Sequence, residues 1–247
     1  MLRDLIAEAE QAVVRIICRD IGAEGSGFLV TANGHVLTNH HVVAELTLQR
    51  GRIGVVYSNS IQVAIDGTEY PATLLNDPMD DRPVVYDYAI LKIDGAPSAR
   101  FLDVGETARA RRGDEVVCLG YPLDFETLIA TSGIVSDILR GPSHVNSLHQ
   151  MTTIVSDALI TFGSSGGPML HVGTGKVIGI NTRPHELSDV LRQRLETWRT
   201  HPTASDFALL RDLVDYTLKY TYVGLNHAVS IEHAMADNIM SGIVGSP

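Results

Sequence analysis

Short segments of strand character, separated by turn signals, follow one another along most of this 247-residue chain. Each combines apolar and β-branched residues, and Gly, Asn, Asp or Pro stands between them. Many short strands at this spacing are typical of a β-sandwich or a β-barrel. Before residue 94 the candidate strands are 13–18, 26–31, 34–38, 53–57, 61–65, 70–75 and 88–93. After residue 114 they are 115–119, 127–138, 151–155, 168–172, 176–182 and 222–230.

The two sets of strands predict an all-β fold with two barrels, because a connector of turn-forming residues, 94–98, divides them. We expect one unit over 1–95, an N-terminal helix and the first barrel. The second unit, over 96–247, is expected to hold the second barrel. Residues 2–11 have apolar side chains at helical spacing, and residues 231–240 predict a closing helix.

Residues 183–221 interrupt the strands with apolar side chains at helical spacing on both sides of His201-Pro202. This pattern predicts a helical hairpin inserted into the second barrel. Such an insertion is either a packed decoration or a lid or docking surface, through which a regulatory partner or a second copy could bind.

The bulk composition narrows the class of protein. A formal net charge of −10 argues against nucleic acid or an anionic membrane as the main partner. No apolar run approaches the length of a membrane span, and residues 1–20 do not read as a secretory signal, which favours a cytoplasmic location. Cys18 and Cys118 each lie in an apolar strand-like segment, so we expect buried free thiols.

Three polar residues with apolar flanks occur in the order His41, Asp87 and Ser165. Serine is a weak nucleophile at neutral pH and needs a base, which in turn needs an orienting partner. We therefore predict Ser165 as the nucleophile, His41 as the general base and Asp87 as the orienting acid. Each residue alone also has a structural interpretation, as a tight turn, a surface histidine or a strand start.

Glycines surround the candidate nucleophile in Phe162-Gly163-Ser164-Ser165-Gly166-Gly167-Pro168. Glycine lets the backbone turn sharply, so we expect the segment Gly163, Ser164 and Ser165 to form an oxyanion hole. The N–H groups of Gly163 and Ser165 would point at the developing charge. The same motif fits the nucleophile elbow of an α/β-hydrolase, but the Gly-Gly-Pro that follows is a poor helix start. No metal-ligand cluster or phosphate-binding loop is apparent, and no cofactor is expected.

With these motifs the chain resembles the protease domain of the HtrA/Deg branch of trypsin-like, chymotrypsin-fold serine proteases. The matching stretches are 25–30, 36–43, 87–93, 119–122, 131–136, 163–168 and 177–182. The resemblance implies two six-stranded antiparallel β-barrels with the triad between them, and protein or peptide substrates. The absence of a PDZ domain from this chain is expected as a departure from the family. The resemblance also implies that the second histidine of the pair, His41, is the base. Ser164 and Thr161-Phe162 depart from the family pattern.

The resemblance places the pocket for the residue before the cut between 159–162 and 181–184. Its candidate residues are Leu159, Ile160, Thr161, Phe162, Thr182 and Arg183. Leu159 stands where a trypsin-type pocket would hold Asp, so a preference for Lys or Arg is not expected. Leu159 and Ile160 suggest a shallow pocket for small or aliphatic side chains, and Arg183 could instead favour an acidic group.

Three functions remain open from the sequence. The first is a serine endopeptidase that works through an acyl-enzyme. The second is a latent or inactive module on the protease fold that binds partners or acts like a chaperone. The third is an esterase with an α/β-hydrolase fold, which a mostly β structure would exclude.

Overall fold

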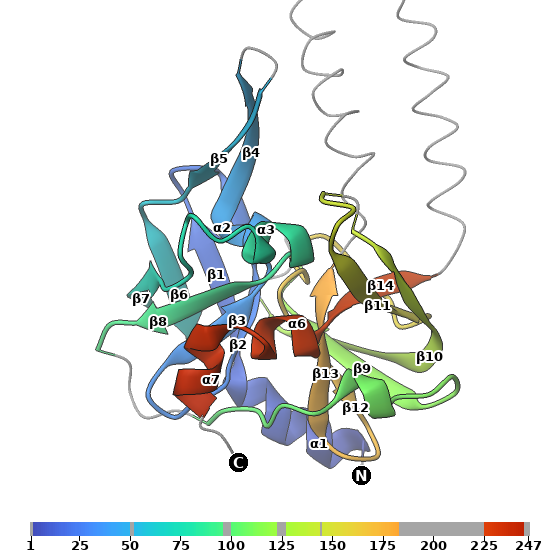
Figure 1. Cartoon of the computed structure of the whole chain (residues 1–247). Helices are drawn as coiled ribbons and strands as arrows, with labels where there is room; N and C mark the ends of the chain where they lie inside the picture. The colour runs from blue at the N-terminus through green and yellow to red at the C-terminus, as the bar shows by residue number, and fades with distance from the viewer. Residues whose placement is uncertain are drawn as a thin grey trace, which may run out of the picture.

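Two closed antiparallel β-barrels of six strands each lie side by side in the computed structural model (Figure 1). The structure describes residues 2–49, 52–95, 100–122, 127–143, 145–182 and 225–244, with the backbone alone for 46–49 and 52–53. The predicted helical hairpin at 183–221 lies outside the described residues. The prediction of an all-β, two-barrel fold is confirmed, and the α/β-hydrolase alternative is wrong.

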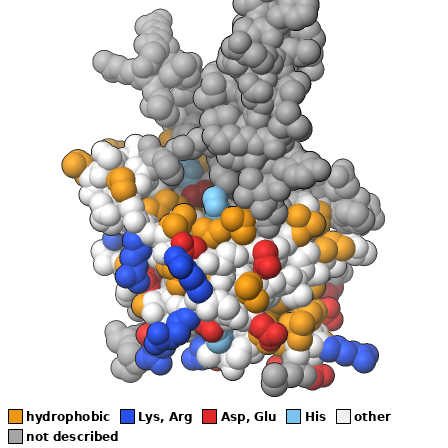
Figure 2. Space-filling model, turned by 90° about the vertical axis from the view of Figure 1, so that its right-hand side faces the viewer, with side chains coloured by type: hydrophobic (Ala, Val, Ile, Leu, Met, Phe, Trp, Pro, Cys, Tyr) orange, Lys and Arg blue, Asp and Glu red, His pale blue; other side chains and the backbone are white. Residues whose placement is uncertain are grey.

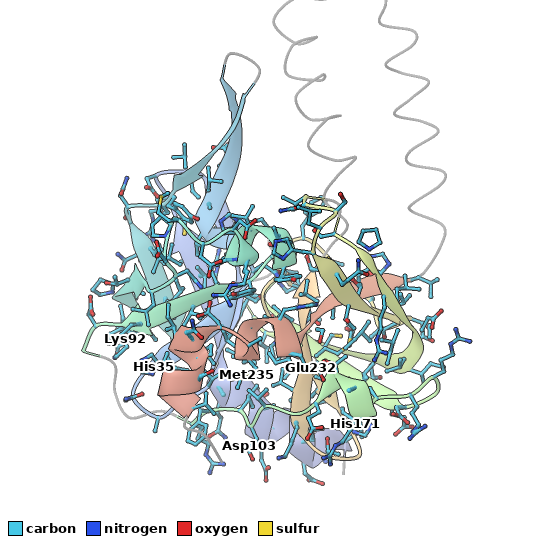
Figure 3. All side chains as sticks on the ribbon, in the orientation of Figure 1. His35, Lys92, Asp103, His171, Glu232 and Met235 are labelled. Atoms are coloured by element: carbon cyan, nitrogen blue, oxygen red, sulfur yellow. The ribbon has the colours of Figure 1, made fainter. Side chains whose placement is uncertain are left out.

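The first barrel closes in the strand order β1-β2-β3-β8-β7-β6. Its strands are β1 (Val13–Cys18), β2 (Ala23–Leu29), β3 (His35–Thr38), β6 (Ile61–Ile65), β7 (Thr68–Leu74) and β8 (Ala89–Ile93). In the pairing of β3 with β8, His35 lies opposite Lys92, and Figure 3 labels both residues. Turns with left-handed glycines join the strands, as at Gly22, Gly34 and Gly67.

The second barrel closes in the order β10-β11-β14-β13-β12-β9. Its strands are β9 (Glu115–Gly120), β10 (Ile129–Pro142), β11 (Gln150–Ser156), β12 (Pro168–His171), β13 (Lys176–Thr182) and β14 (Asn226–Ser230). The strands of the two barrels therefore fall on either side of residue 95. The division of the chain there stays a prediction.

Apolar packing joins the two barrels. One buried cluster combines first-barrel residues such as Phe28, Leu37 and Ile90 with Leu119 and Ile180 of the second barrel. A second cluster fills the interior of the second barrel and includes Ile154, Ile160, Met169 and Cys118. Because the shared cluster is continuous, polar groups at the junction are held at defined distances from one another.

One predicted barrel strand belongs elsewhere. The segment at 53–57 forms β5 (Arg52–Tyr57), which pairs only with β4 (Ala44–Gln49) in a separate two-stranded sheet. This hairpin projects from the first barrel (Figure 1). The sequence prediction did not include β4, because its residues follow the His40-His41 segment without a turn signal. Two short helices flank the barrel, α2 (His40–Val43) and α3 (Arg82–Tyr86).

Helices also cover the ends of the chain. Helix α1 (Leu2–Ala9) continues into a 3-10 turn at Glu10–Ala12, as predicted for 2–11. The predicted closing helix is two helices, α6 (Ile231–Met235) and α7 (Asn238–Val244). Glu232, labelled on α6 in Figure 3, accepts the N–H of Ala108 at 2.9 Å and so fastens this end to the inter-barrel connection. None of the helices in the described ranges has the length and apolar character needed to cross a membrane.

Candidate active site

The candidate base and acid meet where α2 and α3 face each other. His41 Nδ1 lies 2.9 Å from Asp87 Oδ1 and 3.0 Å from Oδ2, and the His41 N–H donates to Oδ1 at 3.1 Å. A carboxylate on Nδ1 selects the tautomer that carries the proton there. Nε2 is thereby left as the nitrogen able to accept a proton from a serine.

Asp87 has an unusual backbone that its neighbours hold in place. It caps α3 in the left-handed region, with φ 52° and ψ 53°. Asn39 Nδ2 donates to the Asp87 carbonyl at 2.8 Å, and Thr182 Oγ1 donates to Asp87 Oδ2 at 2.8 Å. A non-glycine residue in this region is strained unless its surroundings determine it. Contacts from both barrels therefore aim this carboxylate at His41.

The structure separates the two adjacent histidines. His40 is only 5% exposed, and its ring lies edge-on to Tyr57, with centroids 5.4 Å apart. Burial lowers the pKa of His40 to about 4, so it stays neutral near pH 7. His41 is partly exposed and faces Asp87. The geometry thus agrees with the choice of His41 as the base.

Ser165 lies on a tight turn that leads into β12. Within this turn the Ser164 N–H donates to the Thr161 carbonyl at 3.1 Å, and the Gly167 N–H donates to the Ser164 carbonyl at 3.2 Å. Gly163 has φ 87°, a conformation in which a side chain would be strained. Ser165 itself is 6% exposed, so its environment is largely shielded from water.

Two N–H groups of this turn have no acceptor within the part of the chain that the structure describes, those of Gly163 and Ser165. The peptide between Gly163 and Ser164 is held at both ends, since its carbonyl accepts from Ser26 Oγ and its N–H donates to Thr161. The two unengaged N–H groups flank this fixed peptide. Ser164 belongs to the segment expected to form the oxyanion hole, but its own N–H is engaged by the Thr161 carbonyl.

Ser26 connects the first barrel to this turn. Its hydroxyl donates to the Gly163 carbonyl at 2.7 Å and accepts the Tyr121 N–H at 2.8 Å, and its own N–H donates to the Ser165 carbonyl at 2.8 Å. Ser26 is completely buried. Strand β2 therefore holds the turn through hydrogen bonds to the Gly163 and Ser165 carbonyls.

Gly25 explains how closely the histidine and serine segments approach. A Cβ at this position would lie 2.6 Å from Val42 Cγ2 and 3.0 Å from the Ser165 carbonyl oxygen. Val42 directly follows His41, so residue 25 separates the two segments by the width of one backbone. Glycine-rich segments are typical of turns, but the Gly25-Ser26-Gly27 sequence lies inside β2. Its glycines are required by close packing rather than by a turn.

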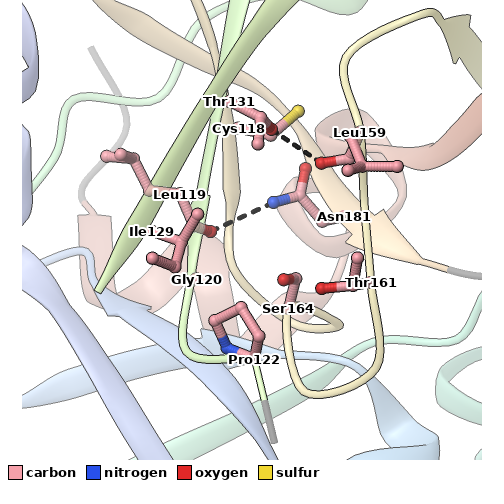
Figure 4. Close-up of a pocket in the computed structure, with 10 residues that line it drawn as sticks. All are labelled: Cys118, Leu119, Gly120, Pro122, Ile129, Thr131, Leu159, Thr161, Ser164 and Asn181. Atoms are coloured by element: carbon pink, nitrogen blue, oxygen red, sulfur yellow. Dashed lines mark hydrogen bonds between the residues drawn. The ribbon is translucent and has the colours of Figure 1, made fainter. Parts of the chain in front are cut away.

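A cavity of about 150 Å³ opens beside the turn (Figure 4). Its lining comes from the ends of β9 and β10, from the segment that precedes Ser165, and from β13. The residues are Cys118, Leu119, Gly120, Pro122, Ile129, Thr131, Leu159, Thr161, Ser164 and Asn181. Ser164, which directly precedes the candidate nucleophile, is one of these residues.

The predicted pocket residues are only partly in this cavity. Leu159 and Thr161 line it. Ile160 does not, because its side chain is buried in the second-barrel core. Phe162 is 54% exposed and is not among the lining residues, and the Thr182 hydroxyl donates to the Asp87 carboxylate. The remaining candidate, at position 183, lies outside the described residues.

Sequence patterns missed three residues that organise the site, Ser26, Asn39 and Thr182 in its contact with Asp87. All three lie in the stretches that carry the family resemblance, which was the only available signal. Their hydrogen bonds join segments between 48 and 137 positions apart in the chain. Periodicity within a strand or helix contains no information about such contacts.

The cysteines are free and buried, as expected. Burial raises the pKa of Cys18 to about 11 and that of Cys118 to about 12, which keeps both thiols protonated. In the described residues no group of three or more His, Cys, Asp or Glu side chains is placed to hold a metal ion.

The sequence of this chain is similar to a known family and to curated proteins. A model of the trypsin-like peptidase domain matches residues 25–180. The chain is 34% identical over 190 residues to serine protease HTRA1B of Danio rerio, covering 73% of this chain and 36% of the relative. It is 37% identical over 163 residues to mitochondrial serine protease HTRA2 of Bos taurus, covering 65% of this chain and 31% of the relative. The chain thus spans about a third of the length of the curated relatives it matches.

Solved structures share the fold. The HtrA-type protease AlgW with tripeptide superposes with a TM-score of 0.66 at 25% identity, covering 99% of this chain and 64% of the other. The inactive form of the Rv3671c protease gives a TM-score of 0.62 at 22% identity, with 98% and 93% coverage. From the family match and this common fold it follows that the chain belongs to the trypsin-like peptidase family.

Proposed function

We propose that this chain is a serine endopeptidase that cleaves peptide bonds through an acyl-enzyme. Ser165 Oγ attacks the scissile carbonyl while His41 Nε2 accepts its proton and then delivers it to the leaving amine. Asp87 holds the imidazole in the required tautomer and stabilises the imidazolium. The N–H groups of Gly163 and Ser165 stabilise the oxyanion, where loss of one donor typically costs about 100- to 1,000-fold in rate.

The observation that carries this proposal is the two-oxygen contact of Asp87 with His41 Nδ1, at 2.9 and 3.0 Å. This contact orients Nε2 away from the acid. Donors from Asn39 and Thr182 hold the same Asp87 in place, and β2 brings the Ser165 turn against the histidine segment. Such an arrangement prepares a base, whereas a purely structural histidine would not require an acid fixed from both barrels.

The alternative function, a latent or inactive binding module, is less favoured. The relatives that match are proteases by name. The unengaged N–H groups of Gly163 and Ser165 also support an assembled site. A peptidase implies protein or peptide substrates, whereas the regulatory partner or oligomer expected through 183–221 stays a prediction.

The direct experiment is labelling with a fluorophosphonate, which forms a covalent bond with an activated serine. We expect fast labelling of the wild-type protein and none of Ser165→Ala. His41→Ala should label at least about 1,000-fold more slowly, because the base is lost. A folded wild-type protein that does not label would contradict the peptidase proposal and favour the binding module.

We further propose that the cavity takes an uncharged side chain before the cut. Its lining contains no carboxylate among the described residues, and the position next to the turn is occupied by Leu159. A buried cation without a counter-charge is strongly disfavoured. A peptide-library profile dominated by Lys or Arg before the cut would contradict this assignment.

Apolar contact beyond the cavity is also available on the second barrel. Figure 2 shows the side of the molecule that lies on the right in Figure 1. Hydrophobic side chains, in orange, lie along the upper part of this side, next to the residues drawn in grey. The exposed large hydrophobic side chains of the second barrel are Ile134, Leu139, Val145, Leu148, Leu159, Phe162 and Leu225. An unfolded or extended segment of a protein substrate could pack against such side chains.

A further inference from the structure

A buried carboxylate in the C-terminal helices is connected to the segment that holds the candidate acid. Asp237 lies between α6 and α7 and is 3% exposed. Its Oδ2 accepts the Tyr88 hydroxyl at 2.8 Å and Asn76 Nδ2 at 3.4 Å, and its Oδ1 accepts the Ile239 N–H at 2.9 Å. Burying a carboxylate is costly unless hydrogen bonds compensate it, so such a group calls for an explanation.

The first of these donors fixes the chain on the C-terminal side of Asp87. Tyr88 directly follows Asp87 and is completely buried. Its N–H donates to the Pro83 carbonyl at 3.1 Å, so both its backbone and its hydroxyl are held. Burial and the neighbouring Asp237 carboxylate raise the pKa of Tyr88, so the hydroxyl keeps its proton and remains a donor. The residue after the candidate acid therefore has a defined position.

The second donor reaches the same strand two residues further on. Asn76 is buried, and its Oδ1 accepts the Ile90 N–H at 2.7 Å while its Nδ2 donates to Asp237. The Ile90 carbonyl in turn accepts the Leu75 N–H at 2.8 Å. Asp237 is thus connected to residues 88 and 90, at the point where β8 leaves the candidate acid.

The same helices also contact the residue before Asp87. Tyr86 ends α3, and its ring stacks on that of His233 in α6, with centroids 4.1 Å apart and planes 8° from parallel. His233 is held in turn, because its Nε2 accepts the Thr152 N–H at 2.9 Å. Helix α6 contacts both α3 and β13, and Figure 1 shows it at the junction of the two barrels. The C-terminal helices therefore support both neighbours of Asp87 in the chain.

This support matters because Asp87 adopts a strained backbone. Its φ of 52° lies in the left-handed region, where a non-glycine residue persists only if its surroundings determine it. Asn39 and Thr182 hold the carbonyl and the carboxylate of Asp87 itself. The contact between Tyr88 and Asp237 fixes the direction in which the chain continues. A misplacement of a catalytic group by about 1 Å can cost about 100-fold in rate.

We propose that Asp237 is a positioning residue for the catalytic acid. By accepting the Tyr88 hydroxyl, it holds the chain that follows Asp87 and so keeps the Asp87 carboxylate on His41 Nδ1. It acts through Tyr88 and not on the reacting atoms. This inference rests on the proposed endopeptidase function, and it adds the C-terminal helices to the parts of the molecule on which the rate depends. A purely structural contact would contribute to stability and leave the rate of the folded protein unchanged.

Tyr88→Phe tests the contact, because it removes one hydroxyl and keeps the buried ring. Labelling at several fluorophosphonate concentrations gives the rate at saturation and the concentration for half-saturation. We expect the saturating rate to fall at least about fivefold with half-saturation within about twofold of wild type, since the acid serves the chemical step and not binding. A smaller fall in the saturating rate, or a change confined to half-saturation, would overturn the proposal.

A matched control separates the rate from stability. Val63→Ala shortens a side chain of β6 in the buried cluster that also contains Tyr88, and it leaves the hydrogen bonds of residues 76, 88 and 237 in place. Urea denaturation should show a loss of stability in both variants, whereas the saturating rate should fall in Tyr88→Phe alone. Equal falls in the two variants would show that the rate follows general destabilisation, which would overturn the role of Asp237.

A double-mutant cycle identifies the path. Asp237→Ala should also lower the saturating rate, and adding Tyr88→Phe to it should lower the rate by no more than about a further twofold. Effects that multiply would overturn the assignment through the Tyr88 hydroxyl. Where Asp237→Ala fails to fold, the comparison of Tyr88→Phe with Val63→Ala decides the question. Absence of labelling in the wild-type protein would overturn the endopeptidase proposal, whereas labelling of Tyr88→Phe at the wild-type rate would overturn only the role of Asp237.

Discussion

Substitution of Ser26 by alanine tests whether the first barrel holds the nucleophile turn in its working form. Ser26 Oγ donates to the Gly163 carbonyl at 2.7 Å and accepts the Tyr121 N–H at 2.8 Å, and the residue is completely buried. Ser26→Ala leaves both backbone groups without a partner and introduces no bulk. The backbone N–H of residue 26, which donates to the Ser165 carbonyl, is unaffected.

The magnitude follows from these two contacts. An unsatisfied buried donor or acceptor costs about 1–3 kcal/mol, so the free energy of unfolding should fall by about 2–4 kcal/mol once some relaxation is allowed. The peptide between Gly163 and Ser164 loses one of its two anchors. Since the unengaged N–H groups flank this peptide, we expect the rate of fluorophosphonate labelling to fall by about 10- to 100-fold.

Urea denaturation at pH 7.5 measures the first quantity, and labelling at several probe concentrations measures the second. The matched control is Ser132→Ala, because Ser132 is exposed on β10 and should change stability by less than about 0.5 kcal/mol. If Ser26→Ala matched this control in both stability and labelling rate, the reasoning about the anchored peptide would be refuted.

Three further perturbations address the rest of the site. Gly25→Ala puts a Cβ 2.6 Å from Val42 Cγ2, so labelling should fall at least about 100-fold, whereas Gly141→Ala, with open space around its Cβ, should label normally; equal rates would contradict the close approach. Thr182→Val removes the donor to the acid and should slow labelling about tenfold, with Thr182→Ser restoring it; an unchanged rate for valine would exclude an orienting role. Burial holds the pKa of His40 at about 4, below its unfolded value of about 6.5, so its stabilising contribution is complete above pH 6.5 and is lost as pH falls toward 4. This loss amounts to about 3 kcal/mol, and urea denaturation at pH 7.5 and 4.5 should show a smaller decrease in His40→Gln than in the wild type; identical decreases would show that His40 is not buried neutral.

Most strands could be predicted because each is a local pattern. The segments at 13–18, 61–65 and 176–182 coincide with β1, β6 and β13, since apolar residues and turn signals define both ends. The pattern failed to show which sheet a strand belongs to. It could not show that 53–57 pairs with Ala44–Gln49 outside the barrel, because strand pairing depends on which edges are free in three dimensions.

The site, like the fold, was predictable from the sequence only in part. His41, Asp87 and Ser165 were chosen from motif and order, and the structure brings the first two into contact. The pocket was harder to predict, because Ile160 and Thr161 are adjacent in the chain yet face the core and the cavity respectively. Alternation along an irregular turn is not a reliable guide to the direction of a side chain.

The sequence by itself determined the two-barrel β fold, the family resemblance and the identity of the candidate nucleophile, base and acid. These depend on local periodicity and on short motifs, which are written in consecutive residues. Only the tertiary structure decided that Ser26 holds the nucleophile turn by hydrogen bonds and that Thr182 and Asn39 hold Asp87. Each of these facts is a contact between segments far apart in the chain, and such contacts exist only once packing of the two barrels brings the segments together.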